Sequence, residues 1–133
     1  MTFHLQIVTP DGLYYDGQAT CVSVPSIDGQ VSILARHINY VTALGMGLAK
    51  VTTEEGERFA ACIGGMLTVT NNEVRVVATT FEWAGEIDVA RSQASLERAE
   101  AMLADSSLDD KARQAANARK KRAQVRLSAA KKA

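Results

Sequence analysis

Few residues in this chain have the chemistry of a catalytic or metal site. Its 133 residues include two histidines, His4 and His37, and two cysteines, Cys21 and Cys62. Neither histidine has a second ligand-type residue at metal-binding spacing, and there is no CxxC or HxxxH pair. Gly64-Gly65 lacks the following lysine of a phosphate-binding loop, so we interpret it as a strand bend or bulge. We therefore expect no catalytic residue and no metal site.

The strongest charged feature is the end of the chain. Residues 111–133 hold nine basic residues and no acidic one, whereas residues 1–110 hold all 15 acidic residues and six basic ones. A basic segment of this kind could meet phosphates, anionic lipid or an acidic protein surface. The acidic remainder would repel nucleic acid, and large apolar residues are too few for a membrane-surface helix. An acidic protein surface fits best, while nucleic-acid binding and a merely solvated helix face stay open as alternatives.

Composition changes near residue 84 and divides the chain into two parts. All seven aromatic residues, both prolines and eight of the nine glycines precede this point, and 14 of the last 50 residues are alanine. Glycine and proline mark turns, while alanine, glutamate, lysine and arginine favour helix. We therefore expect a β-rich domain over residues 1–84 and a helical domain over residues 85–133.

Short apolar runs separated by turn signals predict a compact antiparallel sandwich or barrel in the first part. Hairpin turns are expected at Asp28-Gly29, Glu54–Glu57 and Asn71-Asn72, and a further turn at Asp16-Gly17. No uncharged stretch approaches the roughly 20 residues of a membrane helix. The two cysteines suit small core positions in a reducing compartment, and the first residues do not resemble a signal peptide.

The second part predicts two helices joined by a short loop. Asp88 is the expected N-cap of a helix that ends near Ala104, and a second helix runs from about Leu108 to Ser128. A short loop implies an antiparallel hairpin. Because a buried methyl contributes only about 0.8 kcal/mol, a seam of alanines should hold this hairpin weakly and allow it to rearrange. The expected seam residues are Ala90, Ala94 and Ala101 in the first helix and Ala112, Ala115, Ala116 and Ala123 in the second.

Three segments together resemble the epsilon subunit of the bacterial rotary ATP synthase. They are VPSIDGQVSIL (residues 24–34) followed by Arg36-His37, FAACIGGMLTV (59–69), and EIDVARSQASLERAE (86–100). The resemblance extends over nearly the whole chain. It implies an α+β fold, in which an antiparallel β-sandwich of about ten strands is followed by an antiparallel α-helical hairpin.

The resemblance also implies a function. In that family the subunit is non-catalytic and belongs to the rotating central stalk, where it binds the gamma subunit, contacts the ring of c subunits and couples proton flow to ATP synthesis. Its hairpin can extend along gamma and inhibit ATP hydrolysis by the alpha and beta subunits. A member of this family would lie at the cytoplasmic face of the bacterial plasma membrane, associated with the membrane only through the complex, and would not bind nucleic acid.

The resemblance assigns partner surfaces to particular residues. The gamma subunit would lie near His37, and the acidic surface of the beta subunits would meet the basic helix, with Arg119, Lys120, Arg122 and Arg126 as candidates. The segment that faces the c ring comprises Ser26, Ile27, Asp28, Gly29, Gln30, Val31 and Ser32.

This chain departs from the family pattern at several positions. Ser32 replaces a usual glycine, which questions any positive φ there, and Asn39 replaces a usual proline, which should loosen its turn. Phe81 and Trp83 occupy a run that is usually more polar, and we expect them to pack between the sandwich and the hairpin.

Some relatives bind ATP on the folded hairpin through the motif I/L-D-x-x-R-A. This chain has Ile87-Asp88-Val89-Ala90-Arg91-Ser92, with serine in place of the final alanine. Asp88 could accept a hydrogen bond from the adenine amine, and arginines could pair with phosphates. The alternative is that Asp88 only caps a helix and Arg91 forms a local surface pair. No cofactor is required, and ATP would be a regulatory ligand, held by Glu82, Ile87, Asp88, Arg91, Arg98, Arg122 and Arg126.

Overall fold

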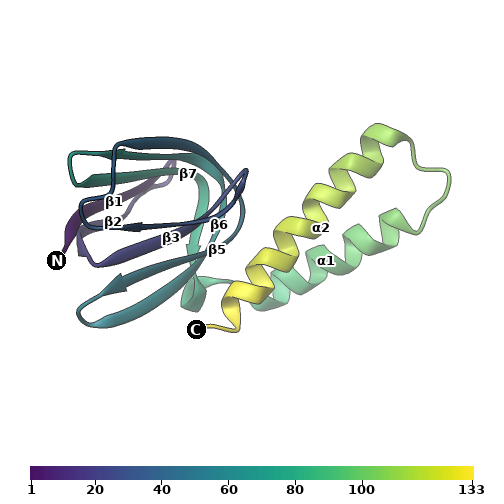
Figure 1. The fold of residues 1–133 in the computed structure, drawn as a ribbon. Helices are drawn as coiled ribbons and strands as arrows, with labels where there is room; N and C mark the ends of the chain where they lie inside the picture. Colours follow the sequence, from purple (N-terminus) through teal and green to yellow (C-terminus); the bar gives the residue numbers. More distant parts are fainter.

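The computed structural model describes residues 1–133 as a folded β-sheet from which a helical hairpin projects (Figure 1). A 3-10 helix, η1 (Ala84–Glu86), joins the two parts, and the hairpin consists of α1 (Val89–Leu103) and α2 (Asp110–Ala130). The strands are β1 (Phe3–Thr9), β2 (Gly12–Ala19), β3 (Cys21–Ser26), β4 (Gly29–Leu34), β5 (Tyr40–Thr53), β6 (Gly56–Thr70) and β7 (Glu73–Trp83).

The seven strands form one sheet in the order β2-β1-β7-β6-β5-β3-β4, and this sheet folds over on itself into a sandwich. The pairing of β6 with both β5 and β7 skips Gly64, and Gly64 and Gly65 have φ values of 71° and 121°. Glycine adopts such angles readily, so the three long strands bend at this level and pass through both layers. The predicted sandwich is confirmed. It has seven continuous strands instead of about ten, because β5, β6 and β7 each serve both layers.

One apolar core lies between the two layers. Leu5 and Val76 come from one layer and Val51 and Phe81 from the other, and each is at most 1% exposed. The rings of Tyr14 and Phe81 meet edge to face at 5.8 Å, and those of Phe81 and Trp83 at 5.0 Å. Phe81 and Trp83 therefore belong to the core of the sandwich, and their predicted position between sandwich and hairpin is wrong. Phe81 and Trp83 are two positions apart in β7, so both side chains lie on the same face of the strand, which beyond the bend faces the core.

Two details of the first strands differ from the prediction. β1 pairs with β7 in parallel, so the sheet is not wholly antiparallel. These two strands are far apart in sequence, and no tight turn forces them to run in opposite directions. The turn expected at Asp16-Gly17 is absent, because both residues pair with β1 inside the continuous strand β2.

His4 connects three strands on the surface of the sheet. Its Nε2 hydrogen-bonds with Asp16 of β2, and its Nδ1 lies 3.8 Å from Glu73 of β7. The hydrogen bond with Asp16 is the main reason that the pKa of His4 rises above its ordinary value of 6.5. A protonated imidazole is thus favoured by the folded state.

This arrangement predicts a pH-dependent contribution to stability. Because the folded-state pKa of His4 is raised, its contribution should be fully present below the unfolded-state pKa and should disappear as pH rises through the folded-state pKa. We expect His4→Gln to lower the free energy of unfolding more at about pH 5.5 than at about pH 8.5. Urea denaturation at both pH values measures this difference, and a loss that grew with pH would contradict the prediction.

The helical hairpin begins and ends at capped residues. Asp88 caps α1 as predicted, since its carboxylate accepts a hydrogen bond from Arg91 N at 3.0 Å, and Asp109 caps α2 through Ala112 N at 2.7 Å. In the connecting loop, the hydroxyl and backbone N–H of Ser107 both donate to Asp105, which lowers the pKa of that carboxyl. The predicted antiparallel hairpin is confirmed.

Small residues form the contact between α1 and α2. In α1 they lie on a different face of the helix from the one predicted. Ser92 and Ala99 of α1 and Ala116 and Ala123 of α2 are at most 6% exposed. Ala116 and Ala123 were expected there. The other expected seam residues are exposed or half-buried: Ala90, Ala94, Ala101, Ala112 and Ala115. Alanine occurs all around these helices, so its spacing alone does not define the buried face.

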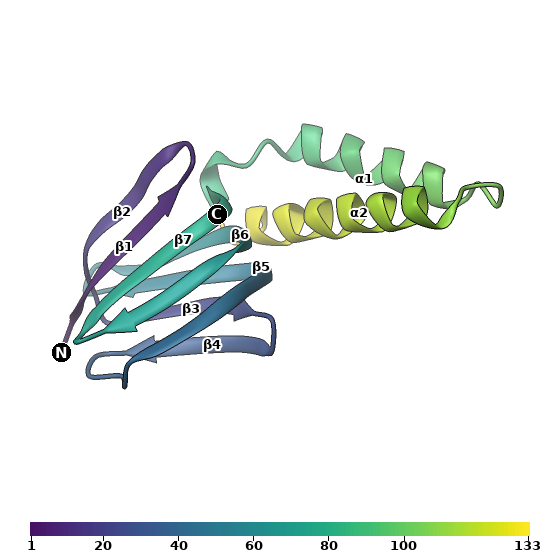
Figure 2. The same cartoon turned by 90° about the horizontal axis from the view of Figure 1, so that it is seen from above.

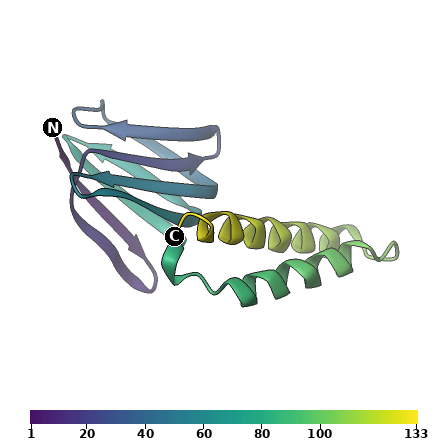
Figure 3. The same cartoon turned by 90° about the horizontal axis from the view of Figure 1, so that it is seen from below.

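The hairpin contacts the sandwich through its base and projects its tip away (Figures 2 and 3). Ile87 and Ala129 pack on Ala61 of β6, and Leu48 of β5 and Val125 of α2 lie against this cluster. Leu48 and Ala61 pair across β5 and β6. The base of the hairpin therefore covers the outer face of one layer of the sandwich.

Candidate functional site

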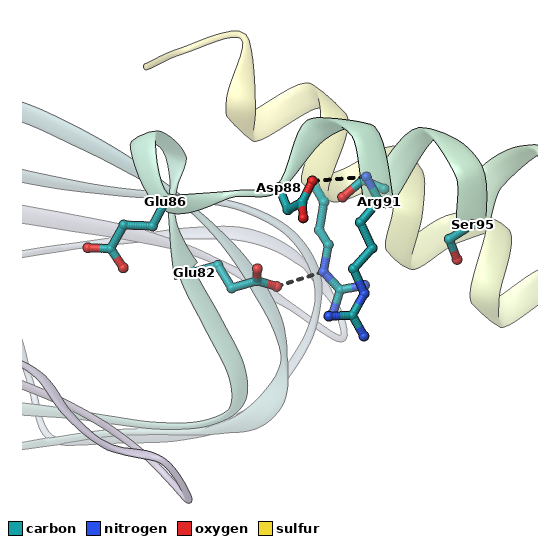
Figure 4. A pocket seen from close by; sticks show the side chains of 7 residues that line it. Glu82, Glu86, Asp88, Arg91 and Ser95 are labelled. Atoms are coloured by element: carbon teal, nitrogen blue, oxygen red, sulfur yellow. Dashed lines mark hydrogen bonds and ion pairs between the residues drawn. The ribbon is translucent and has the colours of Figure 1, made fainter.

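A cleft of about 410 Å³ lies where β7 and η1 meet the hairpin (Figure 4). This volume is in the range of small-molecule sites. No hydrophobic residue lines the cleft. Its walls are formed by Glu82, Glu86, Asp88, Arg91, Ser92, Ser95 and Arg126. The structure thus brings together four residues of the predicted nucleotide site: Glu82, Asp88, Arg91 and Arg126.

One ion pair crosses the cleft from the sandwich to the hairpin. Arg126 Nε of α2 donates to Glu82 Oε1 of β7 at 2.6 Å, and the two side chains are 27% and 30% exposed. It is the only ion pair between the two parts of the molecule. Partial burial makes such a charge-assisted hydrogen bond stronger than a fully solvated one. Arg126 therefore fastens the base of α2 to the sandwich.

The remaining polar groups of the cleft are available to a ligand. Asp88 uses one carboxylate oxygen for the N-cap, and its second oxygen has no hydrogen bond. The guanidinium of Arg91 is exposed and has no ion-pair or hydrogen-bond partner. Ser92, which stands where the family motif has alanine, is buried beside them. The cleft offers free carboxylate oxygens of Asp88 and Glu86 and one free guanidinium, that of Arg91, which suits a ligand with both an amine and an anionic group.

Three residues of the predicted nucleotide site lie outside the cleft. Ile87 is 8% exposed and belongs to the apolar contact under the hairpin. Arg98 is exposed on α1, and Arg122 is half-buried on α2, one turn before Arg126. In this conformation only Arg91 and Arg126 supply guanidinium groups to the cleft.

The predicted ring-facing segment forms the turn between β3 and β4. The Ser26 hydroxyl donates to Gly29 O at 2.6 Å and accepts from Asp28 N at 3.1 Å, which closes the turn and leaves Ile27 68% exposed. Val31 is half-buried in β4, while Gly29, Gln30 and Ser32 are exposed at this edge of the sheet. Ser32 does not have a positive φ, so the replacement of glycine introduces no backbone strain.

The other predicted partner residues lie at separate places. His37 lies in the loop between β4 and β5, half-buried and tilted against the ring of Tyr40 at 5.8 Å. Arg119 and Lys120 lie in the middle of α2, exposed and half-buried respectively, and form no ion pair. The basic helix thus keeps free cations well away from the sandwich.

A surface that the sequence analysis missed crosses the other outer face of the sandwich. Leu13, Val8, Val77, Met66 and Ala43 pair in sequence across β2, β1, β7, β6 and β5, so their side chains share one face. Ile27 continues this line, since its backbone N–H donates to Ala43 O at 3.2 Å. We call these six residues the apolar row.

Most large side chains of the apolar row are exposed to solvent, unlike those of the core. Leu13 is 57% exposed, Val77 43%, Met66 44% and Ile27 68%. The neighbouring Val41, on the same face of β5, is 59% exposed. A continuous apolar line on a sheet face indicates an interaction surface. The only sign of this surface in the sequence is Val77, an apolar residue at a position where the alternation along β7 predicts a polar one.

Other chemistry is limited. No group of three or more His, Cys, Asp and Glu side chains lies close enough together to hold a metal ion. Burial raises the pKa of the Cys62 thiol to about 12, so it stays protonated at neutral pH. Neither α1 nor α2 combines the length and hydropathy of a bilayer-spanning helix.

Comparison with known proteins identifies the family. Residues 2–84 match the model of the family described as ATP synthase, Delta/Epsilon chain, beta-sandwich domain. The ATP synthase epsilon chain of Gloeobacter violaceus is 38% identical over 130 residues, which cover 98% of both chains. That of an Exiguobacterium species is 38% identical over 110 residues, covering 82% of this chain and 81% of the relative.

Solved structures share the fold. A chain of the Euglena gracilis mitochondrial ATP synthase, in its OSCP/F1/c-ring assembly, matches 97% of this chain and 81% of its own length with a TM-score of 0.83 at 22% identity. A chain of the Tetrahymena thermophila central stalk and c ring matches 96% and 95% with a TM-score of 0.64 at 16% identity. On the sequence matches, this chain belongs to the ATP synthase delta/epsilon chain family.

Proposed function

We propose that this chain is a non-catalytic subunit of the central stalk of a proton-translocating ATP synthase. The observation that carries the proposal is the match to epsilon chains over nearly the full length of both proteins. The bent sandwich is a stiff body, which transmission of torque requires. The proposed location is the cytoplasmic face of the bacterial plasma membrane, with attachment only through the complex.

The two parts of the chain have different proposed roles. Residues 1–84 bind gamma through the part of the apolar row on β2, β1, β7, β6 and β5, together with the His37 loop. They bind the c ring through the Ser26–Ser32 turn, to which Ile27 at the end of the row belongs. The apolar row supports this role because the hairpin covers the opposite outer face and leaves the row open. Residues 85–133 form the regulatory hairpin, whose Arg119 and Lys120 would meet acidic surfaces of the alpha and beta subunits after release.

Release of the hairpin is consistent with the small contact at its base. The apolar part consists of Ile87, Ala61 and Ala129 with three half-buried neighbours. One ion pair and the contact of Lys132 with the Phe59 ring supplement it. Ile87 is the one large side chain that this contact buries, and the two buried alanines add little apolar area, so the contact contributes only a few kcal/mol. The hairpin can therefore leave the sandwich at low cost while both helices keep their internal hydrogen bonds.

Removal of the hairpin tests the division of roles. In an ATP synthase complex whose copy of this chain ends at Ile87, we expect faster ATP hydrolysis, largely unchanged ATP synthesis and normal retention of gamma and the c ring. Rates of hydrolysis and synthesis in purified complexes, with the full-length chain as control, measure this. Loss of assembly with gamma would show that the binding surface is not confined to the sandwich.

A second proposal is that the cleft binds ATP as a regulatory ligand. Asp88 would accept from the adenine amine through its free oxygen, and Arg91 would pair with the phosphates. Arg126 would have to share its guanidinium between Glu82 and the nucleotide. The cleft is lined by three carboxylates and two guanidiniums, so it has no net positive charge. ATP binding would therefore depend on the position of Arg91 and not on a general attraction for anions.

Calorimetry with ATP tests this proposal. We expect the intact chain to release heat on binding and Arg91→Ala to weaken binding by at least about tenfold, because a charge-assisted pair to phosphate is lost. Arg98→Ala is the matched control, since Arg98 is exposed on the same helix outside the cleft. Absence of heat with the intact chain, or equal affinity in Arg91→Ala, would remove the nucleotide proposal.

The alternative of nucleic-acid binding by the basic helix finds no support. The relatives are named for the ATP synthase, and the excess of acidic residues over residues 1–110 would repel nucleic acid.

A further inference from the structure

Two asparagines tie the loop that contains His37 to the turn between β6 and β7. The backbone N–H of Arg36 donates to Asn72 Oδ1 at 2.8 Å, and the backbone N–H of Asn71 donates to Asn39 Oδ1 at 3.0 Å. Asn72 is also bonded to the N-terminal strand, since its Nδ2 donates to Thr2 O at 3.1 Å. These bonds connect residues 32 to 70 positions apart in sequence. We call them the asparagine clasp.

The clasp joins three residues whose backbone has a positive φ. Arg36 has a φ of 64°, and Asn71 and Asn72 have φ values of 49° and 65°. Asparagine tolerates the left-handed region comparatively well, whereas arginine adopts it reluctantly. The Asn72 side chain caps the backbone N–H of Arg36 and so compensates for this conformation. Asn39 supplies a second tie, since its Oδ1 accepts the hydrogen bond from the backbone N–H of Asn71.

The held loop presents apolar and imidazole groups next to the apolar row. Ile38 is 78% exposed and His37 is half-buried. The chain then enters β5, where Val41 is exposed on the same face as Ala43 of the apolar row. A fixed loop at this edge extends the interaction surface. Because its exposed groups are already ordered, binding of a partner does not carry the entropic cost of ordering them.

We propose that Asn72, with Asn39, is a positioning residue that preorganises the His37–Ile38 loop for the gamma subunit. The inference rests on the proposed function, in which this face binds gamma. If the loop is released, it occupies the binding conformation only part of the time, and the apparent Kd rises by the inverse of that fraction. Asn72 itself does not have to touch the partner.

Three substitutions separate the clasp from the turn that carries it. Asn72→Gly keeps the left-handed backbone but removes both side-chain bonds. Asn72→Asp keeps the acceptor for Arg36 N–H and loses only the donor to Thr2. Asn71→Gly is the matched control, because it changes the same turn and retains the backbone N–H that donates to Asn39.

Binding to purified gamma subunit is the primary measurement. We expect Asn72→Gly to raise the Kd by about tenfold, mainly through slower association, since the side-chain hydrogen bond that holds Arg36 of the loop is lost. Asn72→Asp should stay within about threefold of the intact chain, and Asn71→Gly should bind equally well. Hydrogen exchange of the Arg36 amide should be fast in Asn72→Gly and slow in the others.

The outcomes distinguish this inference from the proposed function. If the intact chain binds gamma and Asn72→Gly binds equally well, the positioning role is overturned while the proposed function stands. Fast exchange at Arg36 without loss of affinity also overturns it, because the loop would then be free and unimportant. If the intact chain does not bind gamma, the proposed function itself fails. A fall in Tm shared by Asn72→Gly and Asn72→Asp, with weaker binding in both, assigns the residue a merely structural role.

Discussion

Gly65→Ala should strongly destabilise the sandwich. A Cβ at this position would overlap the carbonyl oxygen of Val77 and lie 2.7 Å from Ala78 Cα, and all of these atoms are backbone. The φ of Gly65 is 121°, which is strained for any residue with a side chain. Because backbone in paired strands cannot shift without loss of its hydrogen bonds, we expect a loss of at least about 4 kcal/mol. That is a large part of the about 5–15 kcal/mol by which a typical domain is stable.

Gly56→Ala provides the matched control for this prediction. Gly56 has a similar φ of 130°, but an added Cβ would meet nothing within 4 Å. Its substitution should therefore cost only the backbone strain, about 1–3 kcal/mol. Urea denaturation of both variants isolates the effect of close approach at the bend. Equal losses in the two variants would mean that β6 and β7 can separate at Gly65 without cost.

The bend also explains how far the sequence could predict the fold. Alternation along β7 places Val74, Val76 and Ala78 inside, and Asn71-Asn72 forms the expected turn. Gly64-Gly65 was correctly interpreted as a bend. What local patterns could not show is that one bend serves three strands, because this depends on pairing between residues far apart in sequence. That shared bend reduces about ten segments to seven strands.

The hairpin shows a different limit. An N-cap interaction involves residues close together in sequence, so the start of α1 at Asp88 could be predicted from the sequence alone. The buried face is set by packing between helices, and with alanine at most positions several faces satisfy the same pattern. Ser92 and Ala99 were therefore missed in favour of Ala90 and Ala94.

For the candidate sites too, the sequence predicts what depends on local signals and misses what depends on contacts between distant residues. Glu82 and Arg126, 44 residues apart, meet in an ion pair that the sequence did not predict. Arg98 and Arg122 lie outside the cleft because helical rotation and the docking angle carry them elsewhere. The apolar row requires the register of five strands, and only Val77 gave a local signal of it.

Val77→Glu should abolish binding to the gamma subunit. Val77 lies at the centre of the apolar row, with Val8 on one side and Met66 on the other. A carboxylate here would be buried without a partner when the row is covered, which costs several kcal/mol, so the Kd should rise by at least about 100-fold. The isolated chain should remain folded, because the side chain is 43% exposed and a glutamate there can reach water.

Val89→Glu makes the same chemical change at a matched site away from the apolar row. Val89 is 52% exposed in the first turn of α1, where a glutamate suits the helix dipole. Its affinity for gamma should equal that of the intact chain, as measured by titration with purified gamma. Val77→Thr, which keeps the β-branched shape and adds no charge, should lose much less affinity than Val77→Glu. If Val77→Glu bound gamma as well as Val89→Glu does, the row would face solvent in the complex, and the gamma interface would have to lie at the edges of the sandwich.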